Sequence, residues 1–202
     1  MSGSSLDGLD IVFAAFQENA GKWDYEMLHA DCFAYSEEWT NRLKNATNLN
    51  ALDYQLLHVE YGHYIGQQVN RFRDSYQLNY QVALIASHGH TTFHLPAKRI
   101  TAQLGDGAAI AAETGLPVVT DLRAIDVALG GEGAPIVPIG EKLLLGNYNY
   151  FLNLGGIANI SFNPPSPPGE GGRGDEGRIW PILQSPSSPD RYQCDLSAVF
   201  SE

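Results

Sequence analysis

The chain has 202 residues and a mass of 22.0 kDa; 44% of its residues are hydrophobic and 17% are charged. Chains that stay disordered lack enough apolar surface to offset their conformational entropy, so this composition predicts a folded protein, and its length permits one full domain and part of another. The 12 basic and 23 acidic residues give a net charge of −11, without any stripe of Lys and Arg. This charge disfavours a protein that binds nucleic acid or an anionic membrane surface.

Two features of the sequence bear on the cellular compartment. The two cysteines, Cys32 and Cys194, lie far apart in unlike surroundings, which supports neither a disulfide framework nor a zinc site built from cysteine. The first residues lack the basic and apolar parts of an export signal, and no run of about 18 apolar residues occurs. We expect a cytoplasmic protein without a membrane span.

The first part of the chain predicts a β-hairpin followed by two helices. Residues 9–16 form an apolar run of strand length, and residues 23–34 continue as an alternating strand after the turn at 19–21. Ser36, followed by two glutamates, and Asn50, with an aspartate three residues later, are typical of helix N-termini.

The second helix is expected over residues 52–74, because its apolar residues recur at helical spacing and share one face. These residues are Leu52, Leu56, Val59, Ile65, Val69 and Phe72. Residues 82–86 and 116–120 are interpreted as strands buried on both faces of a parallel sheet, and residues 105–114 between them as a helix that stops at Gly115. The alternation is typical of an α/β fold, in which ligands bind beyond the carboxyl ends of the strands.

The composition changes near the end of the chain. Residues 151–154 and 157–162 predict two strands, joined by glycines that would let the main chain approach a nucleotide or would form a plain turn. From residue 163 onwards Pro, Gly and Ser dominate, so the last 40 or so residues are expected to be poorly ordered.

Residues 1–8 combine two glycines, hydroxyls and a carboxylate just before the first strand. Such a segment lets backbone N–H groups approach phosphate oxygens, although it is not a Walker loop because it lacks Gly-Lys-Ser/Thr. A frayed polar tail is the alternative. Asp7 and Asp10 are candidates to hold Mg²⁺ through water, with ordinary turn aspartates as the alternative.

Residues 87–94 follow a predicted strand and place polar side chains at its carboxyl end. Hydrogen bonding to a sugar or a phosphate is the interpretation that we favour, and histidines that only stabilise a loop are the alternative. His88, His90 and His94 also admit a zinc site and a metal-dependent hydrolase, which no acidic or thiol partner within the segment supports.

Two further segments carry polar groups at predicted strand or helix ends. Residues 103–107 introduce a helix whose free N–H groups would bind an anion or a sugar hydroxyl, unless Asp106 is an ordinary N-cap. Residues 121–126 place two carboxylates and Arg123 after a strand, where the guanidinium would bind a ligand carboxylate or form a structural ion pair.

Five segments together resemble the anhydro-N-acetylmuramic acid kinases, a family of the actin, sugar kinase and Hsp70 ATPase superfamily. The segments, in the family's order and approximate spacing, are MSGSSLDGLD at 1–10, SHGHTTFH at 87–94, QLGDGAAIA at 103–111, TDLRAIDVALGGEGAPIVP at 120–138 and NLGGIANIS at 153–161. The resemblance covers residues 1–162 and corresponds to the N-terminal portion of the family.

The resemblance implies an α/β fold of the ribonuclease H-like, actin-like ATPase type, with a mixed sheet flanked by helices. That domain would span residues 1–148, residues 149–162 would be the first hairpin of a truncated second domain, and residues 163–202 would form the tail. The implied reaction is ATP-dependent: water cleaves the anhydro bond of 1,6-anhydro-N-acetylmuramic acid and O6 is phosphorylated, which gives N-acetylmuramic acid 6-phosphate during peptidoglycan recycling. ATP and Mg²⁺ would be required, and family members tend to form homodimers.

The resemblance also implies site residues. Those that match the phosphate-binding segments are Ser2, Gly3, Ser4, Ser5, Asp7, Gly8, Gly155 and Gly156. Those that match the sugar-site segments are Thr91, Arg123 and Asp126. By the same resemblance Asp7 would hold the metal, and Arg123 would bind the lactyl carboxylate of the sugar.

The sequence departs from the family pattern in three respects. Members carry a hydrophobic strand ahead of the MSG segment, which would anchor the loop on a second side. Ser4 and His90 stand where Thr and Gln are common, and both changes look tolerable. The family's Asp-x-Gly-Pro-Gly-Asn segment, whose Asp is the general base for the attacking water, has no match here, so the catalytic residue is unknown. The sequence therefore allows an active kinase or an inactive fragment that retains at most weak sugar binding.

Overall fold

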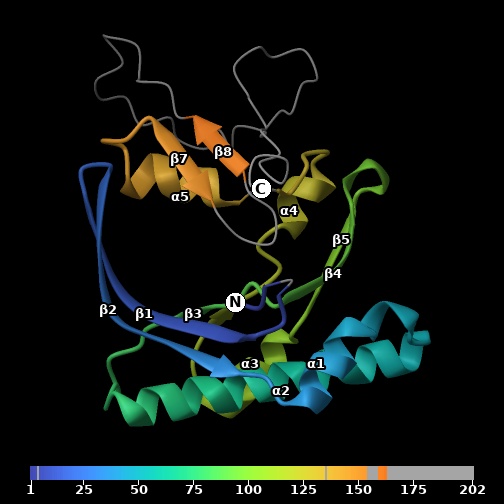
Figure 1. Cartoon of the computed structure of the whole chain (residues 1–202). Helices are drawn as coiled ribbons and strands as arrows, with labels where there is room; N and C mark the ends of the chain where they lie inside the picture. The colour runs from blue at the N-terminus through green and yellow to red at the C-terminus, as the bar shows by residue number, and fades with distance from the viewer. Residues whose placement is uncertain (4, 135, 154–158, 163–202) are drawn as a thin grey trace, which may run out of the picture. The chain divides into compact units, whose positions relative to one another are not determined.

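The computed structural model describes residues 1–3, 5–134, 136–153 and 159–162 (Figure 1). It shows a mixed α/β protein in two compact units. The first unit consists of Met1–Ala15 and Glu26–Gly130, and the second of Phe16–Tyr25 with the residues from Gly131 onwards. Among the described residues, no helix combines the length and the hydrophobicity that a membrane crossing requires. The domain boundary at residue 148 stays a prediction.

The first element is the long hairpin that the sequence predicts. Strands β1 (Gly8–Asn19) and β2 (Lys22–Ala34) form a two-stranded sheet around the turn at residues 20–21. β1 extends one residue before and three residues after the predicted run 9–16, and β2 begins one residue before the predicted run 23–34. Apolar side chains on the hairpin stay accessible, as Val12 and Met27 show with 55% and 68% exposure.

Three helical elements follow the hairpin: α1 (Glu37–Lys44), the 3₁₀ turn η1 (Ala46–Asn48) and α2 (Ala51–Ser75). Both α-helices begin at the predicted N-caps. The Ser36 hydroxyl accepts the Trp39 N–H at 3.2 Å, and the Asn50 side-chain oxygen accepts the Asp53 N–H at 3.0 Å. These bonds satisfy donors that a helix start leaves unpaired.

The buried face of α2 differs from the prediction in the first half of the helix. Ile65, Val69 and Phe72 are buried as expected. Leu52 and Leu56, however, are 68% and 50% exposed, and Leu57 and Tyr61 are buried instead. Leu57, Tyr61, Ile65 and Val69 follow one another at four-residue steps and make a continuous ridge, whereas Leu56 lies about 100° around the helix from Leu57.

Helix α3 (Gly107–Thr114) packs along α2, as Figure 1 shows, and confirms the predicted helix. The Asp106 N–H donates to the His58 carbonyl at 3.1 Å, and the Asn70 side chain donates to the Glu113 carbonyl at 2.8 Å. The core that these helices share with the start of β1 and the end of β5 comprises Leu9, Leu43, Ala46, Leu57, Tyr61, Ile65, Val69, Leu104 and Ile110.

The remaining strands of the first unit are short and pair two by two. They are β3 (Ile85–Ala86) parallel to β6 (Val118–Val119), and β4 (His90–Leu95) antiparallel to β5 (Ile100–Leu104), with the 3₁₀ turn η2 (Pro96–Lys98) between the last two. The strands predicted at 82–86 and 116–120 are thus wrong in length, because only two residues of each find a pairing partner. They are also not buried on both faces, since Leu84 and Val119 are exposed. Strands of the described residues form four two-stranded sheets and not one continuous mixed sheet, so the ribonuclease H-like arrangement stays a prediction.

Helix α4 (Ala124–Ala128) ends the first unit, and the second unit contributes α5 (Val137–Leu144), β7 (Tyr150–Asn153) and β8 (Asn159–Phe162). The last two strands pair antiparallel, with Tyr150 opposite Phe162 and their rings stacked at 4.9 Å. The Ser161 hydroxyl donates to the Glu141 carboxylate at 2.6 Å and ties β8 to α5. The predicted second hairpin is therefore present, and its expected glycine turn and the tail at 163–202 lie outside the described residues.

Candidate functional site

The N-terminal loop, which we define as residues 2–8, folds back on itself ahead of β1. An antiparallel bridge between Ser2 and Leu9 closes it, and the Leu6 N–H donates to the Gly3 carbonyl at 3.3 Å. Leu6 adopts a left-handed backbone conformation with φ of 55°. A residue other than glycine in that region costs about 1–3 kcal/mol and is found most often at ligand sites and switches.

Three contacts fix the N-terminal loop to the first unit. The Ser2 hydroxyl is hydrogen-bonded to His90 Nδ1 at 3.1 Å, and both side chains are buried. The Asp7 carbonyl accepts the N–H of Tyr35 at 3.2 Å, and the Leu6 carbonyl lies 3.5 Å from the Thr40 hydroxyl. The described residues of the loop are therefore tied to the unit, and these contacts do not fit the interpretation as a frayed tail.

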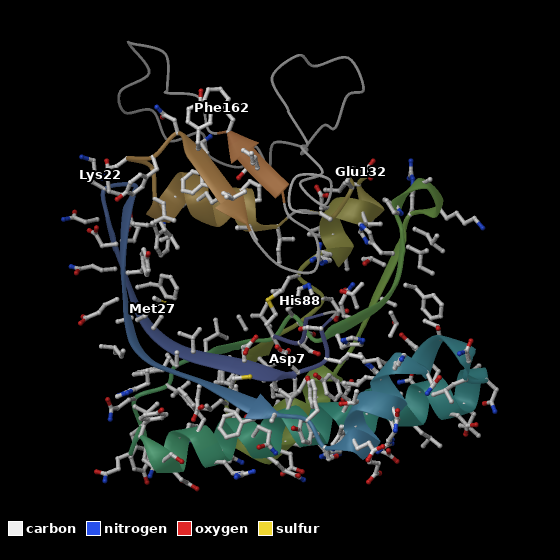
Figure 2. All side chains as sticks on the ribbon, in the orientation of Figure 1. Asp7, Lys22, Met27, His88, Glu132 and Phe162 are labelled. Carbon is white, nitrogen blue, oxygen red and sulfur yellow. The ribbon has the colours of Figure 1, made fainter. Side chains whose placement is uncertain are left out.

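Asp7 is the exposed carboxylate of the loop (Figure 2). Its Oδ1 accepts the Ser5 hydroxyl at 2.8 Å and the Gly8 N–H at 3.1 Å. The hydrogen bond from Ser5 is the largest of the effects that lower the pKa of Asp7 below its ordinary value of 3.8. Asp7 is thus ionised at neutral pH, and a carboxylate oxygen facing solvent suits Mg²⁺, which binds through one or two carboxylates and otherwise water or phosphate oxygens.

Two tyrosines that the sequence interpretation missed lie beneath the loop. The Tyr35 and Tyr61 hydroxyls are 2.5 Å apart, and Tyr61 is fully buried. Burial raises the pKa of both phenols, and the Ser2 hydroxyl acts against this rise. Tyr61 stands four residues after Leu57 in the sequence and so shares its face of α2. A phenol on a buried face needs a polar partner, and this is the signal that could have pointed to the pair.

The histidine segment, residues 87–94, contacts the arginine segment, residues 120–126. The Arg123 Nε donates to His88 Nε2 at 2.9 Å, so that nitrogen is an acceptor, and His88 Nδ1 carries the proton that it donates to the Gly89 carbonyl at 3.1 Å. Burial lowers the pKa of His88 and of His90 below their ordinary value of 6.5. Both imidazoles are neutral at pH 7, and His88 orients Arg123 (Figure 2 labels His88).

Residues 103–107 are joined to the histidine segment through strand pairing. His90 lies opposite Leu104 in the ladder of β4 and β5, and the Gly105 N–H donates to His58 Nδ1 at 3.2 Å. The Asp106 carboxylate accepts the Ala109 N–H at 2.7 Å and lies 3.7 Å from His58 Nε2. Asp106 is therefore a helix N-cap, which was the alternative interpretation of this segment.

The three histidines of the segment turn to different partners. His88 contacts Arg123, His90 contacts Ser2, and His94 Nδ1 is hydrogen-bonded to the Thr101 hydroxyl at 3.2 Å. In the part of the chain that the structure describes, no three His, Cys, Asp or Glu side chains gather around one point. The geometry does not support the zinc hydrolase.

The remaining predicted site residues are Thr91, Asp126, Ser4, Gly155 and Gly156. Thr91 on β4 lies 3.5 Å from Nε2 of Gln103 on the paired strand, and Asp126 is half-buried in the first turn of α4. Ser4, Gly155 and Gly156 lie outside the described residues. The binding roles of all the predicted site residues stay predictions.

Comparison with known proteins gives the decisive observation. The family model for anhydro-N-acetylmuramic acid kinase matches residues 1–174. The chain belongs to the anhydro-N-acetylmuramic acid kinase family. It is 35% identical over 175 residues to the kinase of that name from Haemophilus influenzae, which covers 82% of this chain and 44% of the relative. It is 36% identical over 180 residues to the one from Vibrio parahaemolyticus, covering 85% of this chain and 48% of the relative.

A third relative, the anhydro-N-acetylmuramic acid kinase of Paramagnetospirillum magneticum, is 48% identical over 84 residues, which is 40% of this chain and 24% of the relative. The chain spans less than half the length of these curated relatives. The predicted family resemblance, including its restriction to an N-terminal portion, is confirmed. Four of its five motif segments fall wholly or partly in the first unit, where the contacts above bring them together.

Proposed function

We propose that this chain supplies the phosphate loop and part of the sugar site of an ATP-dependent kinase that acts on 1,6-anhydro-N-acetylmuramic acid. In the proposed reaction a water oxygen attaches to C1 of the sugar as the bond from C1 to O6 breaks, one proton of that water is released, O6 takes the γ-phosphoryl group of ATP, and ADP leaves. The product is N-acetylmuramic acid 6-phosphate. The observation that carries the proposal is the joining of the N-terminal loop to the histidine segment through Ser2 and His90.

The N-terminal loop has the groups that a phosphate requires. The loop is built from small residues, and the left-handed Leu6 turns the chain sharply, a combination that lets a main chain approach an anion. Ser2, Gly3, Ser4, Ser5 and Gly8 would contact phosphate oxygens in this proposal, and Gly155 and Gly156 are proposed for the same role on the family resemblance. Asp7 would hold Mg²⁺, in part through water; when bound, the cation would neutralise charge on the phosphates.

Arg123 is the residue proposed to bind the carboxylate of the sugar. A guanidinium pairs with a carboxylate through two parallel hydrogen bonds, and His88 holds its Nε in a fixed orientation. Because the His88 imidazole is neutral, it adds no positive charge of its own beside the guanidinium. Thr91 and Asp126 would hydrogen-bond to sugar hydroxyls.

We also propose the fold type, the compartment, the pathway and the association state of the protein. The fold would be of the ribonuclease H-like, actin-like type, the protein would act in the cytoplasm in peptidoglycan recycling, and two copies would associate. An alternative is that the chain as given binds the sugar weakly and transfers no phosphate. The specific observation in its favour is that the sequence contains no Asp-x-Gly-Pro-Gly-Asn segment, so no general base for the water is identified.

One experiment separates these outcomes. The purified chain is incubated with ATP, Mg²⁺ and the anhydro sugar in ¹⁸O-enriched water, and the products are analysed by mass spectrometry. The proposal predicts a sugar 6-phosphate that carries one ¹⁸O, and loss of that product in Arg123→Gln. Sugar binding without product supports the inactive alternative. The absence of both binding and product contradicts both hypotheses.

A further inference from the structure

A second pocket of the first unit adjoins the N-terminal loop, because a Cβ added at Gly8 would stand 2.6 Å from the Sγ of its lining residue Cys32. It has a volume of about 360 Å³ and lies between the end of β2, α1 and α2. We call it the aromatic pocket. Its lining residues are Cys32, Phe33, Ala34, Ser36, Trp39, Tyr64, Gln68 and Arg71.

The walls of the aromatic pocket are rigid rings. The Trp39 and Tyr64 rings pack with centroids 4.7 Å apart, and Tyr64 stacks in turn on the buried Tyr61 at 5.9 Å. Flat apolar walls of this kind favour a ligand with a ring.

One cation, Arg71, lines the aromatic pocket and is held in place, while Arg42 lies outside the lining, 4.5 Å from the centre of the Trp39 ring. Arg71 Nη1 donates to the side-chain oxygen of Gln68 at 3.1 Å, and its guanidinium lies 5.6 Å above the Phe33 ring. Gln68 is itself buried. Among the described residues Arg71 forms no ion pair with a carboxylate. The guanidinium is therefore oriented by neutral groups and keeps its charge for a ligand.

No acidic residue lines the aromatic pocket, although acidic residues outnumber basic ones by 23 to 12 in the whole chain. The Cys32 thiol also stays neutral, because its hydrogen bond with Asp10 raises its pKa. Burial raises the pKa of Tyr64, with Arg71 opposing that rise, so the phenol is a neutral donor beside the cation. The lining thus offers one positive charge and no negative charge.

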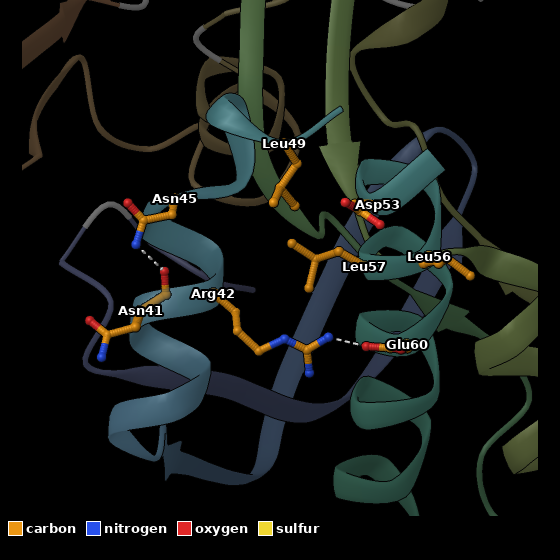
Figure 3. A pocket seen from close by; sticks show the side chains of 8 residues that line it. All are labelled: Asn41, Arg42, Asn45, Leu49, Asp53, Leu56, Leu57 and Glu60. Carbon is orange, nitrogen blue, oxygen red and sulfur yellow. Dashed lines mark hydrogen bonds and ion pairs between the residues drawn. The ribbon is translucent and has the colours of Figure 1, made fainter. Parts of the chain in front are cut away.

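The pocket between α1 and α2 shows the opposite chemistry (Figure 3). It has a volume of about 450 Å³, and Arg42 there pairs with Glu60, while Asp53 also lines it. Its cation is already neutralised within the protein, so nothing selects a charged ligand. The comparison singles out the aromatic pocket as the site with an unneutralised charge.

We propose that the aromatic pocket binds a small organic monocarboxylate with a flat or ring-shaped apolar body. The single guanidinium matches one carboxylate, whereas a phosphate dianion needs more positive charge than the lining supplies. The Trp39 and Tyr64 rings cover the apolar body, and the volume lies within the range of ligand pockets, about 300–1,000 Å³. The inference does not depend on the proposed kinase function.

Benzoate is the probe that tests the proposal, with benzylamine, benzyl alcohol and inorganic phosphate as matched comparisons. We expect saturable one-to-one binding of benzoate with a Kd near 1 mM, by isothermal titration, and at least tenfold weaker binding of the other three. Absence of saturation with benzoate, or equal binding of benzylamine or phosphate, overturns the proposal.

Variants locate the binding. Arg71→Gln is expected to weaken benzoate at least tenfold, and Arg71→Lys to give an intermediate loss because it keeps the charge without the planar fork. Arg99→Gln, which removes the same charge from an exposed residue after η2, is the control and should leave binding unchanged. Both side chains are exposed, so folding should survive, and circular dichroism checks this. Equal benzoate affinity in the wild type and Arg71→Gln places the ligand elsewhere and contradicts the inference.

Discussion

Two regions of the molecule contain similar apolar residues but bury them differently. One is the layer formed by helices α2 and α3, and the other is the hairpin of strands β1 and β2. Tyr61 and Ile110 in the helical layer are fully buried, whereas Val12 and Met27 on the hairpin are 55% and 68% exposed. The helices cover one another, while the hairpin packs against the helical core through Leu9, Ile11 and Phe33 and leaves its other apolar side chains more exposed. The spacing of apolar residues therefore indicates which segments form strands or helices, and burial against neighbouring elements decides how much each segment stabilises the fold.

The tightest point on the buried side is Gly89, and its replacement should have the largest effect. Its φ is 68°, and a Cβ added there would stand 2.2 Å from the Leu104 carbonyl oxygen. Gly89→Ala is expected to lower the free energy of unfolding by about 3–5 kcal/mol, from backbone strain plus overpacking. Urea unfolding measures it.

Gly115→Ala is the control, since Gly115 has a φ of 67° but nothing within 4 Å of the added Cβ. It should cost only about 1–2 kcal/mol, the strain alone. Equal losses in the two variants would show that the backbone conformation, and not the close packing against β5, matters at Gly89.

Truncating a core side chain tests the difference between the two regions directly. Ile110→Ala should lower the free energy of unfolding by about 3 kcal/mol, because it removes a fully buried side chain and leaves a cavity. Met27→Ala on the hairpin should change it by less than about 0.5 kcal/mol. A comparable loss in Met27→Ala would mean that the hairpin face is covered in solution.

Removing the link between the N-terminal loop and strand β4 is expected to have a smaller effect. Ser2→Ala should cost about 1–2 kcal/mol, because it leaves the buried His90 Nδ1 without its hydrogen-bond partner. Ser5→Ala, which removes an exposed hydroxyl from the same loop, should cost less than about 0.5 kcal/mol. Chemical denaturation compares the two variants, and an equal cost would contradict the assigned anchoring role of Ser2.

The smallest expected effect is a pH dependence carried by the buried histidines. Burial sets the folded pKa of His88 and His90 below 6.5, so the unfolded chain binds more protons in the window below that value. The free energy of unfolding should therefore decrease as pH falls from 7.5 to 5.5. His90→Gln should flatten this loss without abolishing it; an unchanged pH slope in the variant would contradict the role of His90.

Local signals predicted much of the fold. The hairpin and both helix N-caps, at Ser36 and Asn50, follow from residues that are adjacent in sequence and act on their own backbone. The lengths of β3 and β6 did not follow, because a strand ends where its partner ends, and that depends on segments far away in the chain. Leu52 and Leu56 were assigned to the buried face for a similar reason: helical periodicity admits neighbouring stripes, and only the packing of α3 selects one.

The candidate site shows the same limit. Motif positions singled out Ser2, His90, His88 and Arg123, but not their pairing across 35 and 88 residues of sequence. Tyr35 and Tyr61 were missed because their polar role depends on which hydroxyl lies nearby in space.

We propose above all that the N-terminal loop, the histidine segment and the arginine segment form one site, in which Arg123 binds the anhydro sugar and the loop binds phosphate. Isothermal titration of the chain with 1,6-anhydro-N-acetylmuramic acid tests it, in the wild type and in Arg123→Gln. We expect saturable binding of the sugar by the wild type. Binding should weaken at least tenfold in Arg123→Gln, because a charge-assisted pair is lost, and should be unchanged in Arg71→Gln. Absence of binding by a folded wild type, or equal binding by Arg123→Gln, would contradict it.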